Sequence, residues 1–572
     1  MKWYFVPSQE RPQGRDDHGS GIETLPRALL DRHGARVLHP AEAPVAQDWR
    51  TPRSTVYRAR TLLVPPALQS GSALNQVNDA LAAVGLELVT VAEPAELADE
   101  RELADLPTIA VLTPVRGKGR PPVAVDAWTA LVALREAAGL RDPDRGEHHG
   151  KGNDDGRATG LSAYAADVAR VSLEHVLVGA LITGSPEIDG NPEIDGNPAI
   201  PSYLAVNGGS RTPAQVYLDA PDRIDSDQDF TRQFGRRPVV AVLDSGVRSH
   251  PWLGVQRLAA GGYQASGSVR VSPHLQKAIH AVAAAAATAG DHGRGRIMDP
   301  WDAPVTPDPL VGELGVALGH GTFIAGIFRQ VVPNATVLSV RIMHSDDVVN
   351  EGDLLAALKL LAARVIKARN EGKPELMIDA ISLSLGYYNE SGPDFAYSSA
   401  LKTAIDTLLD LGVVVVAAAG NNASGRRFYP AAFAAAPRPA GRLSVCSVGA
   451  LNPSGTRAIF SDDGHWVNAW VSGAAVLSTY PDDVRGSLMP AEKLSDGSWT
   501  RESLNPDDYR GGFCLWNGTS FSAPGLAARF VKALLAGAPN GELTDISTGA
   551  TVQRALSALR AMAQEGGGPE DG

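Results

Sequence analysis

The second half of the chain alternates short, almost entirely apolar runs with longer stretches of helical periodicity. The apolar runs are rich in Val, Ala and Leu, and they are far shorter than a membrane helix. Such runs are typical of strands in a parallel sheet that is covered by helices on both faces. The pattern predicts an α/β fold with a mostly parallel sheet, with strands within 239–243, 337–342, 378–385 and 413–419 and helices within 322–331, 353–368 and 400–411.

The first half lacks this regular alternation and divides into smaller segments. The first residues are rich in Pro, Arg and Asp, and a strand–helix–strand pattern follows them. Further on, helical periodicity at 125–138 and 161–181 leads to a turn-rich connector that repeats Pro-Glu-Ile-Asp-Gly-Asn. The predicted divisions are a loosely structured lead-in (1–55), a small α/β module (56–115), a helical and linker region (116–236), the α/β domain (237–560) and a disordered tail (561–572).

Charge and cysteine content narrow the classes of function. The chain has 52 Lys and Arg against 64 Asp and Glu, a net charge of −12 that argues against nucleic-acid binding. The 2 cysteines are too few for a disulfide framework. No apolar run reaches membrane-helix length, and the first residues lack the apolar core of a signal peptide. We therefore expect no membrane partner and a cytoplasmic location.

Three polar residues stand beside glycines at the ends of the predicted elements. Asp244 ends the run that begins at Val239, His320 opens a helical stretch, and Ser520 opens another. Each residue has an ordinary explanation by itself, as a turn aspartate, a structural histidine or a helix-capping serine. Catalytic groups, however, gather at the carboxyl ends of strands in such sheets. A fourth polar residue, Asn421, follows another apolar strand, and the four are candidates for one site.

Six sequence blocks place these residues in a recognisable order. The blocks are Val-Leu-Asp-Ser-Gly at 242–246, His-Gly-Thr at 320–322, Ser-Leu-Gly at 384–386, Ala-Ala-Gly-Asn at 418–421, Tyr-Pro-Ala at 429–431 and Gly-Thr-Ser-Phe-Ser-Ala-Pro at 518–524. The order aspartate, histidine, serine is that of subtilisin and differs from the chymotrypsin and α/β-hydrolase orders. The chain between about 237 and 540 resembles the subtilisin-like serine peptidases, the subtilases.

The resemblance implies a role for each residue. Ser520 Oγ would attack the scissile carbonyl, His320 would carry the proton to the leaving amine, and Asp244 would hold the imidazole. The Asn421 side-chain amide and the Ser520 backbone N–H would form the oxyanion hole. An extended polypeptide substrate would lie as an added strand along two edges, made by Ser384, Leu385 and Gly386 and by Ala418, Ala419 and Gly420.

The chain departs from the family pattern at several places. Phe323 replaces a second histidine that is common in the family, and Phe521 stands where methionine is usual, which indicates a change in core packing. Tyr387 replaces a common glycine, so the shape of the specificity pocket does not carry over. Two stretches, 254–316 and 481–512, are longer than a minimal subtilase needs, and an alanine-rich helix in the first could wall or lid the cleft.

Other clusters have simpler interpretations. The group Glu147, His148, His149, Asp154 and Asp155 could hold a metal, but a solvated connector is favoured in so glycine-rich a loop, and a plain turn is favoured over calcium binding at Asp189 and Asp195. Subtilases often bind calcium, but no matching ligand loop is identified, so we expect no cofactor. Cys446 is expected to be a buried apolar residue, and Cys514 to be no nucleophile beside a complete serine set.

The sequence therefore predicts a serine endopeptidase that acts by acyl transfer. The alternative is a catalytically silent scaffold of the same fold that binds extended peptides. Two hypotheses stay open for the N-terminal region: a prosegment within 56–115 that plugs the site of a zymogen, or a permanent recognition or regulatory domain. A long stretch of chain separates 56–115 from the peptidase half, which speaks against the prosegment hypothesis.

Overall fold

A computed structural model gives the fold of the chain. It describes residues 2–6, 25–45, 49–92, 94, 104–115, 123–140, 162–180, 211–224, 226–304, 310, 312–390, 399–538 and 542–565.

The second half of the chain is built on an eight-stranded sheet that is parallel except at one edge, where β1 runs antiparallel to β19. The α/β fold class predicted from the apolar runs is confirmed. In spatial order the strands are β1 (Trp3–Phe5), β19 (Ala469–Ser472), β18 (Cys446–Leu451), β16 (Val414–Ala418), β14 (Ala380–Leu383), β8 (Val239–Asp244), β12 (Thr336–Arg341) and β11 (Val269–Val271).

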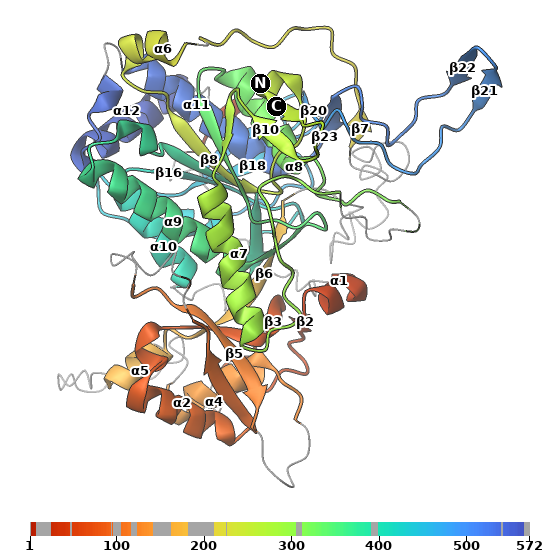
Figure 1. Cartoon of the computed structure of the whole chain (residues 1–572). Coiled ribbons are helices and arrows are strands. Elements are labelled where there is room, and N and C mark those ends of the chain that lie inside the picture. The colour runs from red at the N-terminus through yellow and green to blue at the C-terminus, as the bar shows by residue number, and fades with distance from the viewer. Residues whose placement is uncertain are drawn as a thin grey trace.

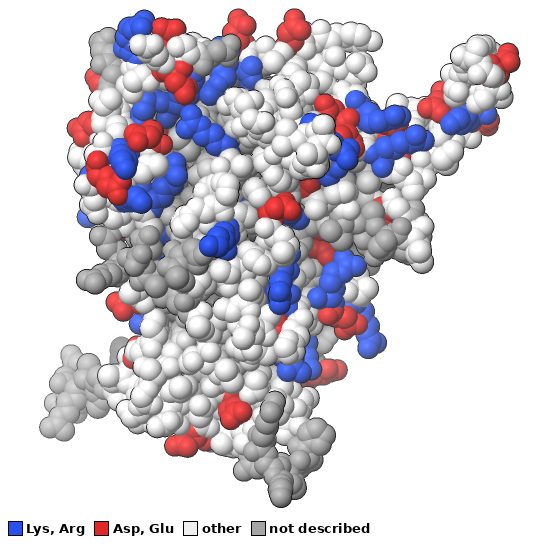
Figure 2. Space-filling view, viewed as in Figure 1, with Lys and Arg blue, Asp and Glu red and all other residues white. Residues whose placement is uncertain are grey.

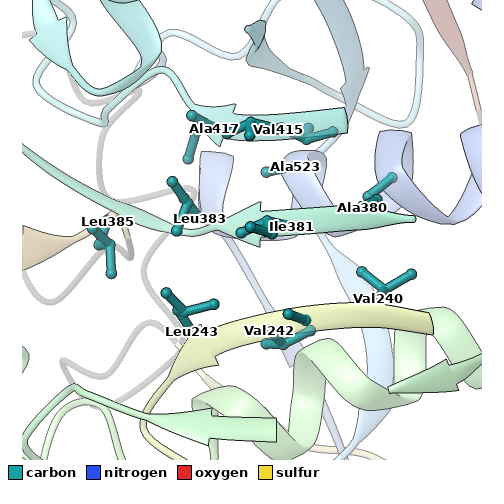
Figure 3. Close-up of a cluster of buried hydrophobic side chains, with 14 of the residues drawn as sticks. Val240, Val242, Leu243, Ala380, Ile381, Leu383, Leu385, Val415, Ala417 and Ala523 are labelled. Atoms are coloured by element: carbon teal, nitrogen blue, oxygen red, sulfur yellow. The ribbon is translucent and has the colours of Figure 1, made fainter. Parts of the chain in front are cut away.

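Helices cover both faces of this sheet (Figure 1). One face carries α8 (His320–Val331) and α11 (Thr519–Ala536), with α12 (Thr548–Glu565) packed on α11, and the other carries α7 (Pro273–Thr288), α9 (Glu351–Asn370) and α10 (Ala400–Asp410). Because both faces are covered, the central strands are buried at every residue, which explains their uniform apolar composition. Figure 3 shows this core, where Ile381 and Val415 of neighbouring strands lie beside Ala523 of α11, and Val242 lies on the next strand.

A second, smaller α/β module lies in the first half of the chain, with an apolar core of its own, in the lower part of Figure 1. Its strands belong to an antiparallel sheet in the order β17-β15-β6-β3-β5-β4, with β2 beside β3 and β13 beside β6. The second half of the chain supplies β13 (Val348–Asn350), β15 (Leu385–Tyr388) and β17 (Phe428–Tyr429) to this sheet. The module's own elements are β2 (Ala35–Leu38), β3 (Thr55–Val64), α2 (Gly71–Ala82), β4 (Leu86–Thr90), β5 (Thr108–Pro114), α4 (Ala127–Ala137), α5 (Ala163–Val168) and β6 (Ser172–Gly179).

Three expectations about local structure need correction. The lead-in is not loosely structured throughout, because it supplies β1, β2 and a short helix, α1 (Arg27–Arg32). The helix predicted from the periodicity at 161–181 is wrong beyond Val168. The chain turns there and forms β6, which pairs with neighbouring strands and has buried apolar side chains. The tail expected from residue 561 is helical to Glu565, since Met562 of α12 is buried in the core. The repeat at 186–197 lies outside the described residues.

Strand β6 belongs to both halves of the molecule. Its first residues pair with β3 of the module, while its last residues lie between β13 (Val348–Asn350) and β15 (Leu385–Tyr388) of the second half. We call this position between β13 and β15 the interstrand site. The module is thus joined to the second half of the chain by a strand that ends inside that half.

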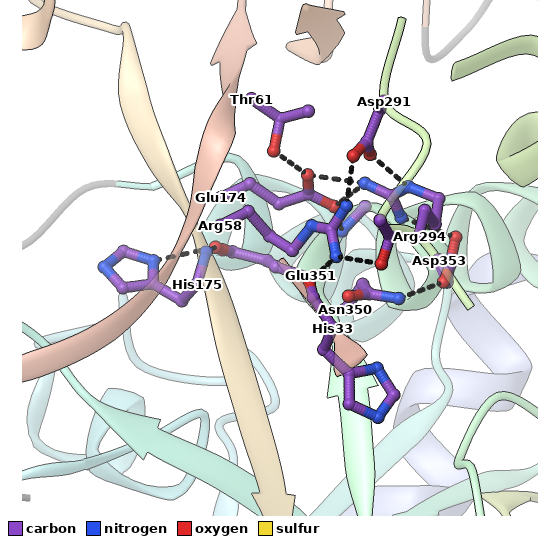
Figure 4. A network of polar contacts seen from close by, with 12 residues as sticks. His33, Arg58, Thr61, Glu174, His175, Asp291, Arg294, Asn350, Glu351 and Asp353 are labelled. Atoms are coloured by element: carbon purple, nitrogen blue, oxygen red, sulfur yellow. Dashed lines mark hydrogen bonds and ion pairs between the residues drawn. The ribbon is translucent and has the colours of Figure 1, made fainter. Parts of the chain in front are cut away.

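Buried ion pairs accompany this strand across the boundary (Figure 4). Arg294 binds Glu174 of β6, Asp291 at 3.1 Å and Asp353 at 3.0 Å, and Arg58 of β3 binds Asp291 as well. All five side chains are almost wholly inaccessible to water. Charged groups are tolerated in such places when each has its partners, so the network fixes the module in one position.

His175 of β6 makes a second buried contact across the boundary. Its Nδ1 lies 2.8 Å from Glu351 and its Nε2 lies 2.9 Å from Glu390. Its ring stacks on Tyr387 at a centroid distance of 4.2 Å. Burial alone would lower the pKa of His175, but the two carboxylates outweigh it and raise the pKa to about 10. His175 is therefore a buried cation at neutral pH.

The remaining elements lie around this frame. The alanine-rich segment considered as a lid forms α7, which packs on α9 and β12 and touches the module. The segment 481–512 carries a hairpin that projects into solvent (Figure 1). On the face in Figure 2, acidic and basic side chains are mixed around α6 and α9. The other elements are β7 (Thr212–Pro213), α6 (Asp227–Phe234), β9 (Val255–Arg257), β10 (Tyr263–Ala265), β17 (Phe428–Tyr429), β20 (Val476–Thr479), β21 (Lys493–Asp496), β22 (Trp499–Glu502) and β23 (Phe513–Trp516).

Candidate active site

Asp244 and His320 meet at the carboxyl end of the central strand. Asp244 is the last residue of β8 and His320 is the first of α8, and both are buried. The His320 Nδ1–H donates to the two carboxylate oxygens of Asp244, at 2.8 Å and 2.9 Å. Asp244 also accepts the Ser245 N–H at 2.7 Å. The carboxylate thus fixes the imidazole ring with its Nε2 turned away from Asp244.

The residue before His320 has to be glycine. Gly319 has a φ of 80°, which side chains disfavour, and a Cβ there would lie 2.4 Å from the Tyr480 ring. Its N–H donates at 2.6 Å to Asp302, a buried carboxyl whose pKa burial raises to about 7. Asp302 thus orients the start of the histidine helix. The sequence analysis missed it, because it lies within the 254–316 stretch and no motif marks it.

Ser520 is the second residue of α11, where the N-terminal backbone groups favour negative charge. Its Oγ–H donates to the Ser384 carbonyl at 3.2 Å, and Ser384 Oγ–H donates to the Ser520 carbonyl at 2.9 Å. His320 Nε2 has no hydrogen-bond partner among the described residues. The Ser520 hydroxyl thus points to Ser384 and has to rotate to reach the imidazole of His320. Catalytic contacts of this kind often form only when substrate is bound.

Asn421 is held by its side-chain oxygen. Asn421 Oδ1 accepts the N–H and the Oγ–H of Thr519, each at 3.0 Å, and Thr519 directly precedes Ser520. The Asn421 Nδ2 is buried without a partner in the described part of the chain. The contact therefore ties the amide to the serine helix and leaves its two N–H groups available.

The end of β6 fills the interstrand site and reaches the serine. The Ala180 N–H donates to the Ser384 carbonyl at 2.9 Å, and the Ala180 carbonyl accepts the Ser520 N–H at 3.0 Å. Before it, Gly179 and Val178 stand opposite Leu385 and Gly386 in antiparallel register. A peptide segment thus lies as an added strand with its last described carbonyl on the serine amide.

The predicted substrate edges divide into two groups. Ser384, Leu385 and Gly386 contact β6 directly, through the hydrogen bonds and register given above. The other edge is bonded elsewhere: Ala418 pairs with β18, the Ala419 N–H donates to the Val448 carbonyl, and the Gly420 N–H donates to Thr519 Oγ1 at 3.2 Å.

The two phenylalanines that depart from the family pattern pack on each other. Phe323 and Phe521 are both buried, with ring centroids 4.4 Å apart. Phe521 also lies 5.4 Å from the His320 ring. The change in core packing expected from the sequence thus involves both phenylalanines, which pack together next to the His320 ring.

A family model described as the subtilase family matches residues 235–563, which is more than half of the chain. The chain belongs to the subtilase family. The match covers the residues that carry Asp244, His320, Asn421 and Ser520, and it leaves the N-terminal module outside.

Several subtilisins are similar to this subtilase over part of their length. Subtilisin DY of Bacillus licheniformis is 31% identical over 179 residues, which are 30% of this chain and 57% of that protein. Subtilisin E of Bacillus subtilis (strain 168) is 30% identical over 172 residues, 29% of this chain and 40% of its own. Subtilisin Savinase of Lederbergia lenta is 29% identical over 178 residues, 30% of this chain and 56% of its own. The matches thus span roughly half of these relatives.

The other candidate groups of this subtilase give no site. Within the described residues, no three His, Cys, Asp or Glu side chains are grouped so that they could hold a metal ion. The acidic and histidine clusters at 147–155 and 189–195 lie outside the described residues. Cys446 and Cys514 are free and buried, and burial raises the pKa of Cys446 to about 12.

No described helix combines the length and the apolar composition that crossing a membrane requires. The cytoplasmic location expected from the sequence stays a prediction.

Proposed function

We propose that the chain is a serine endopeptidase that hydrolyses peptide bonds through an acyl-enzyme. The observation that carries this proposal is the position of the Ala180 carbonyl, which accepts the Ser520 N–H at 3.0 Å. A peptide carbonyl lies against the backbone amide of the serine that would attack it. Donors aimed at a carbonyl oxygen in this way stabilise the negative charge that develops on it during acyl transfer.

The residues around this carbonyl supply the proton transfers. Ser520 Oγ forms a bond to the carbonyl carbon while its proton passes to His320 Nε2, and Asp244 stabilises the imidazolium. The Ser520 N–H and Asn421 Nδ2 would then hold the oxyanion. When the C–N bond breaks, His320 returns the proton to the leaving amine, and water attacks the ester by the same route. Neither His320 Nε2 nor Asn421 Nδ2 has a hydrogen-bond partner among the described residues, so neither atom has to break a hydrogen bond before it takes part in the reaction.

A fluorophosphonate probe tests this proposal. The wild-type protein, once it has cut its own chain, is expected to gain one adduct on the peptidase fragment, measured by intact mass, because an activated serine attacks the probe. The Ser520→Ala variant is the matched control and is expected to gain none. An equal adduct on Ser520→Ala would overturn the assignment. A wild-type chain that neither cuts itself nor gains an adduct would point to a site that stays blocked or to the peptide-binding scaffold.

We further propose that the N-terminal region regulates the peptidase by filling the interstrand site, and that the first bond cut lies between residues 180 and 181. Ala180 makes backbone hydrogen bonds on both sides, to Ser384 and to Ser520, as a bound substrate would. The buried network around Arg294 and the pairing of β1 with β19 favour a region that stays attached after cutting. Of the two hypotheses, the permanent regulatory domain is therefore favoured, with the added property of blocking the site.

The attachment is expected to depend on pH through His175. In the folded chain the pKa of His175 is about 10, above the ordinary value of 6.5. The pairing of His175 with Glu351 and Glu390 therefore stabilises the fold fully below pH 6.5, and this stabilisation is lost as the pH rises through 10. In a Ser520→Ala background, His175→Gln should therefore lower the urea midpoint strongly at pH 6 and progressively less toward pH 10.5. A difference that stays constant over this range would contradict the assignment.

A further inference from the structure

The residue next to Ala180 in the interstrand site is a glycine with a carboxyl group pressed against it. The Gly179 N–H donates to the Asp347 carbonyl at 3.2 Å. A Cβ added to Gly179 would lie 2.1 Å from Asp347 Oδ1, 3.0 Å from its Cγ and 3.1 Å from Met343 Cε. No side chain fits at this position unless Asp347 moves.

Asp347 has little freedom to move. It is buried, and its backbone holds a φ of 74°, which is uncommon for residues other than glycine. Its N–H donates to the His344 carbonyl at 3.0 Å, which closes the turn between β12 and β13. The turn therefore holds the Asp347 backbone at a fixed place beside the interstrand site, and burial limits the room for its side chain.

The carboxyl of Asp347 lies in surroundings that disfavour its charged form. Its Oδ1 has no hydrogen-bond partner among the described residues. Burial, together with the carboxylates of Asp244 and Asp346, raises the pKa of Asp347 well above its usual value. Because its Oδ1 occupies the place that a Cβ on Gly179 would need, the group acts on a substrate chiefly through its volume.

We propose that this enzyme selects extended peptides with glycine directly before the residue whose carbonyl is attacked, and that Asp347 is the residue that imposes this choice. The inference rests on the endopeptidase function proposed above. On this proposal, residues 177–180, Leu-Val-Gly-Ala, have the sequence of a preferred substrate, because Gly179 directly precedes Ala180.

The first test does not require catalysis. In a Ser520→Ala chain, hydrogen exchange at residues 177–180 reports how firmly the segment is seated. Gly179→Ala is expected to speed this exchange at least about tenfold, because one extra carbon in a closed site is discriminated by about 10–200-fold. Adding Asp347→Gly, which suits the positive φ, should bring exchange back to within about threefold of the parent.

The neighbouring residue provides the control for this test. Val178 is half-buried and is not in the position that Asp347 closes, so Val178→Ala should change exchange less than about threefold. If Gly179→Ala exchanges like the parent, or if Asp347→Gly fails to restore the double variant, the role of Asp347 is overturned.

The second test uses catalysis by the self-cleaved enzyme, in which the attached segment 177–180 competes equally with every reporter peptide and so cancels in their ratio. Reporter peptides of the form acetyl-Leu-Val-Xaa-Ala-p-nitroanilide, which release p-nitroaniline when the bond after Ala is cut, are compared with Gly, Ala or Lys at Xaa. kcat/KM should be at least about tenfold higher for Gly than for Ala in the wild type, and the ratio should fall below about threefold in Asp347→Gly. A preference for Lys would overturn the proposal, since it would show an ionised Asp347 binding a cation.

The two tests distinguish a failure of the selection by Asp347 from a failure of the endopeptidase function on which it rests. If exchange responds as expected but no peptide is cut, the selection by Asp347 is supported and the endopeptidase function fails. If all peptides are cut equally, the function stands and the selection fails.

Discussion

The His320→Ala variant is expected to remain in one piece, whereas the wild-type chain cuts itself between residues 180 and 181. The Ala180 carbonyl already lies on the Ser520 amide, so the wild type needs only the rotation of the Ser520 hydroxyl toward the imidazole and the proton transfer that His320 supplies. Without the imidazole, the rate should fall by a factor on the order of 10⁵–10⁶. Intact mass spectrometry over time measures this loss through the appearance of fragments 1–180 and 181–572.

A histidine far from the site gives the matched control for this prediction. His274 is exposed on α7, and His274→Ala should be cut at the wild-type rate. Cleavage of His320→Ala at the wild-type rate and at the same bond would show that another base serves Ser520. A native gel should show the two wild-type fragments migrating together, because the module remains bound through buried contacts.

Replacing Arg294 by methionine is expected to destabilise the molecule by about 3–5 kcal/mol, as removing one member of a buried ion network does. Methionine fills much of the same volume but leaves Glu174 and Asp353 without a cation, while Asp291 keeps Arg58. Urea unfolding in a Ser520→Ala background measures the loss without interference from self-cleavage.

Arg232→Met serves as the comparison for Arg294→Met. Arg232 pairs with Asp229 at 3.0 Å, but the two side chains are 71% and 58% exposed. An exposed pair of this kind contributes about 0.2–1 kcal/mol, so the midpoint should hardly move. Equal midpoint shifts for the two variants would mean that the Arg294 network does not anchor the module.

Much of the peptidase half could be predicted from sequence because both faces of its sheet are covered. Runs such as 413–419 leave no position for a polar residue, and Asp244 and Asn421 stand out where such strands end. The contact between Asp244 and His320 follows from their places at one edge of the sheet.

The N-terminal half resisted prediction for physical reasons. The sequence of β6 favours a helix because the helical periodicity of 161–181 runs through it, and because the consecutive polar residues Glu174 and His175 break the alternation of a half-exposed strand. Both are in fact buried, each against partners far along the chain, such as Arg294 and Glu351. Asp347 likewise carries no motif, and its effect depends on Gly179, which lies in another part of the sequence.

The antiparallel edge strand β1 has a consequence for the order of events during synthesis. Its residues Trp3–Phe5 leave the ribosome well before their partners Val471–Ala469, which follow some 464 residues later. At about 5–20 residues per second, β1 waits roughly 25 to 90 seconds before its partner strand exists. A segment that is made early therefore finds its place late. The sheet edge that it covers closes only after β19 has been translated.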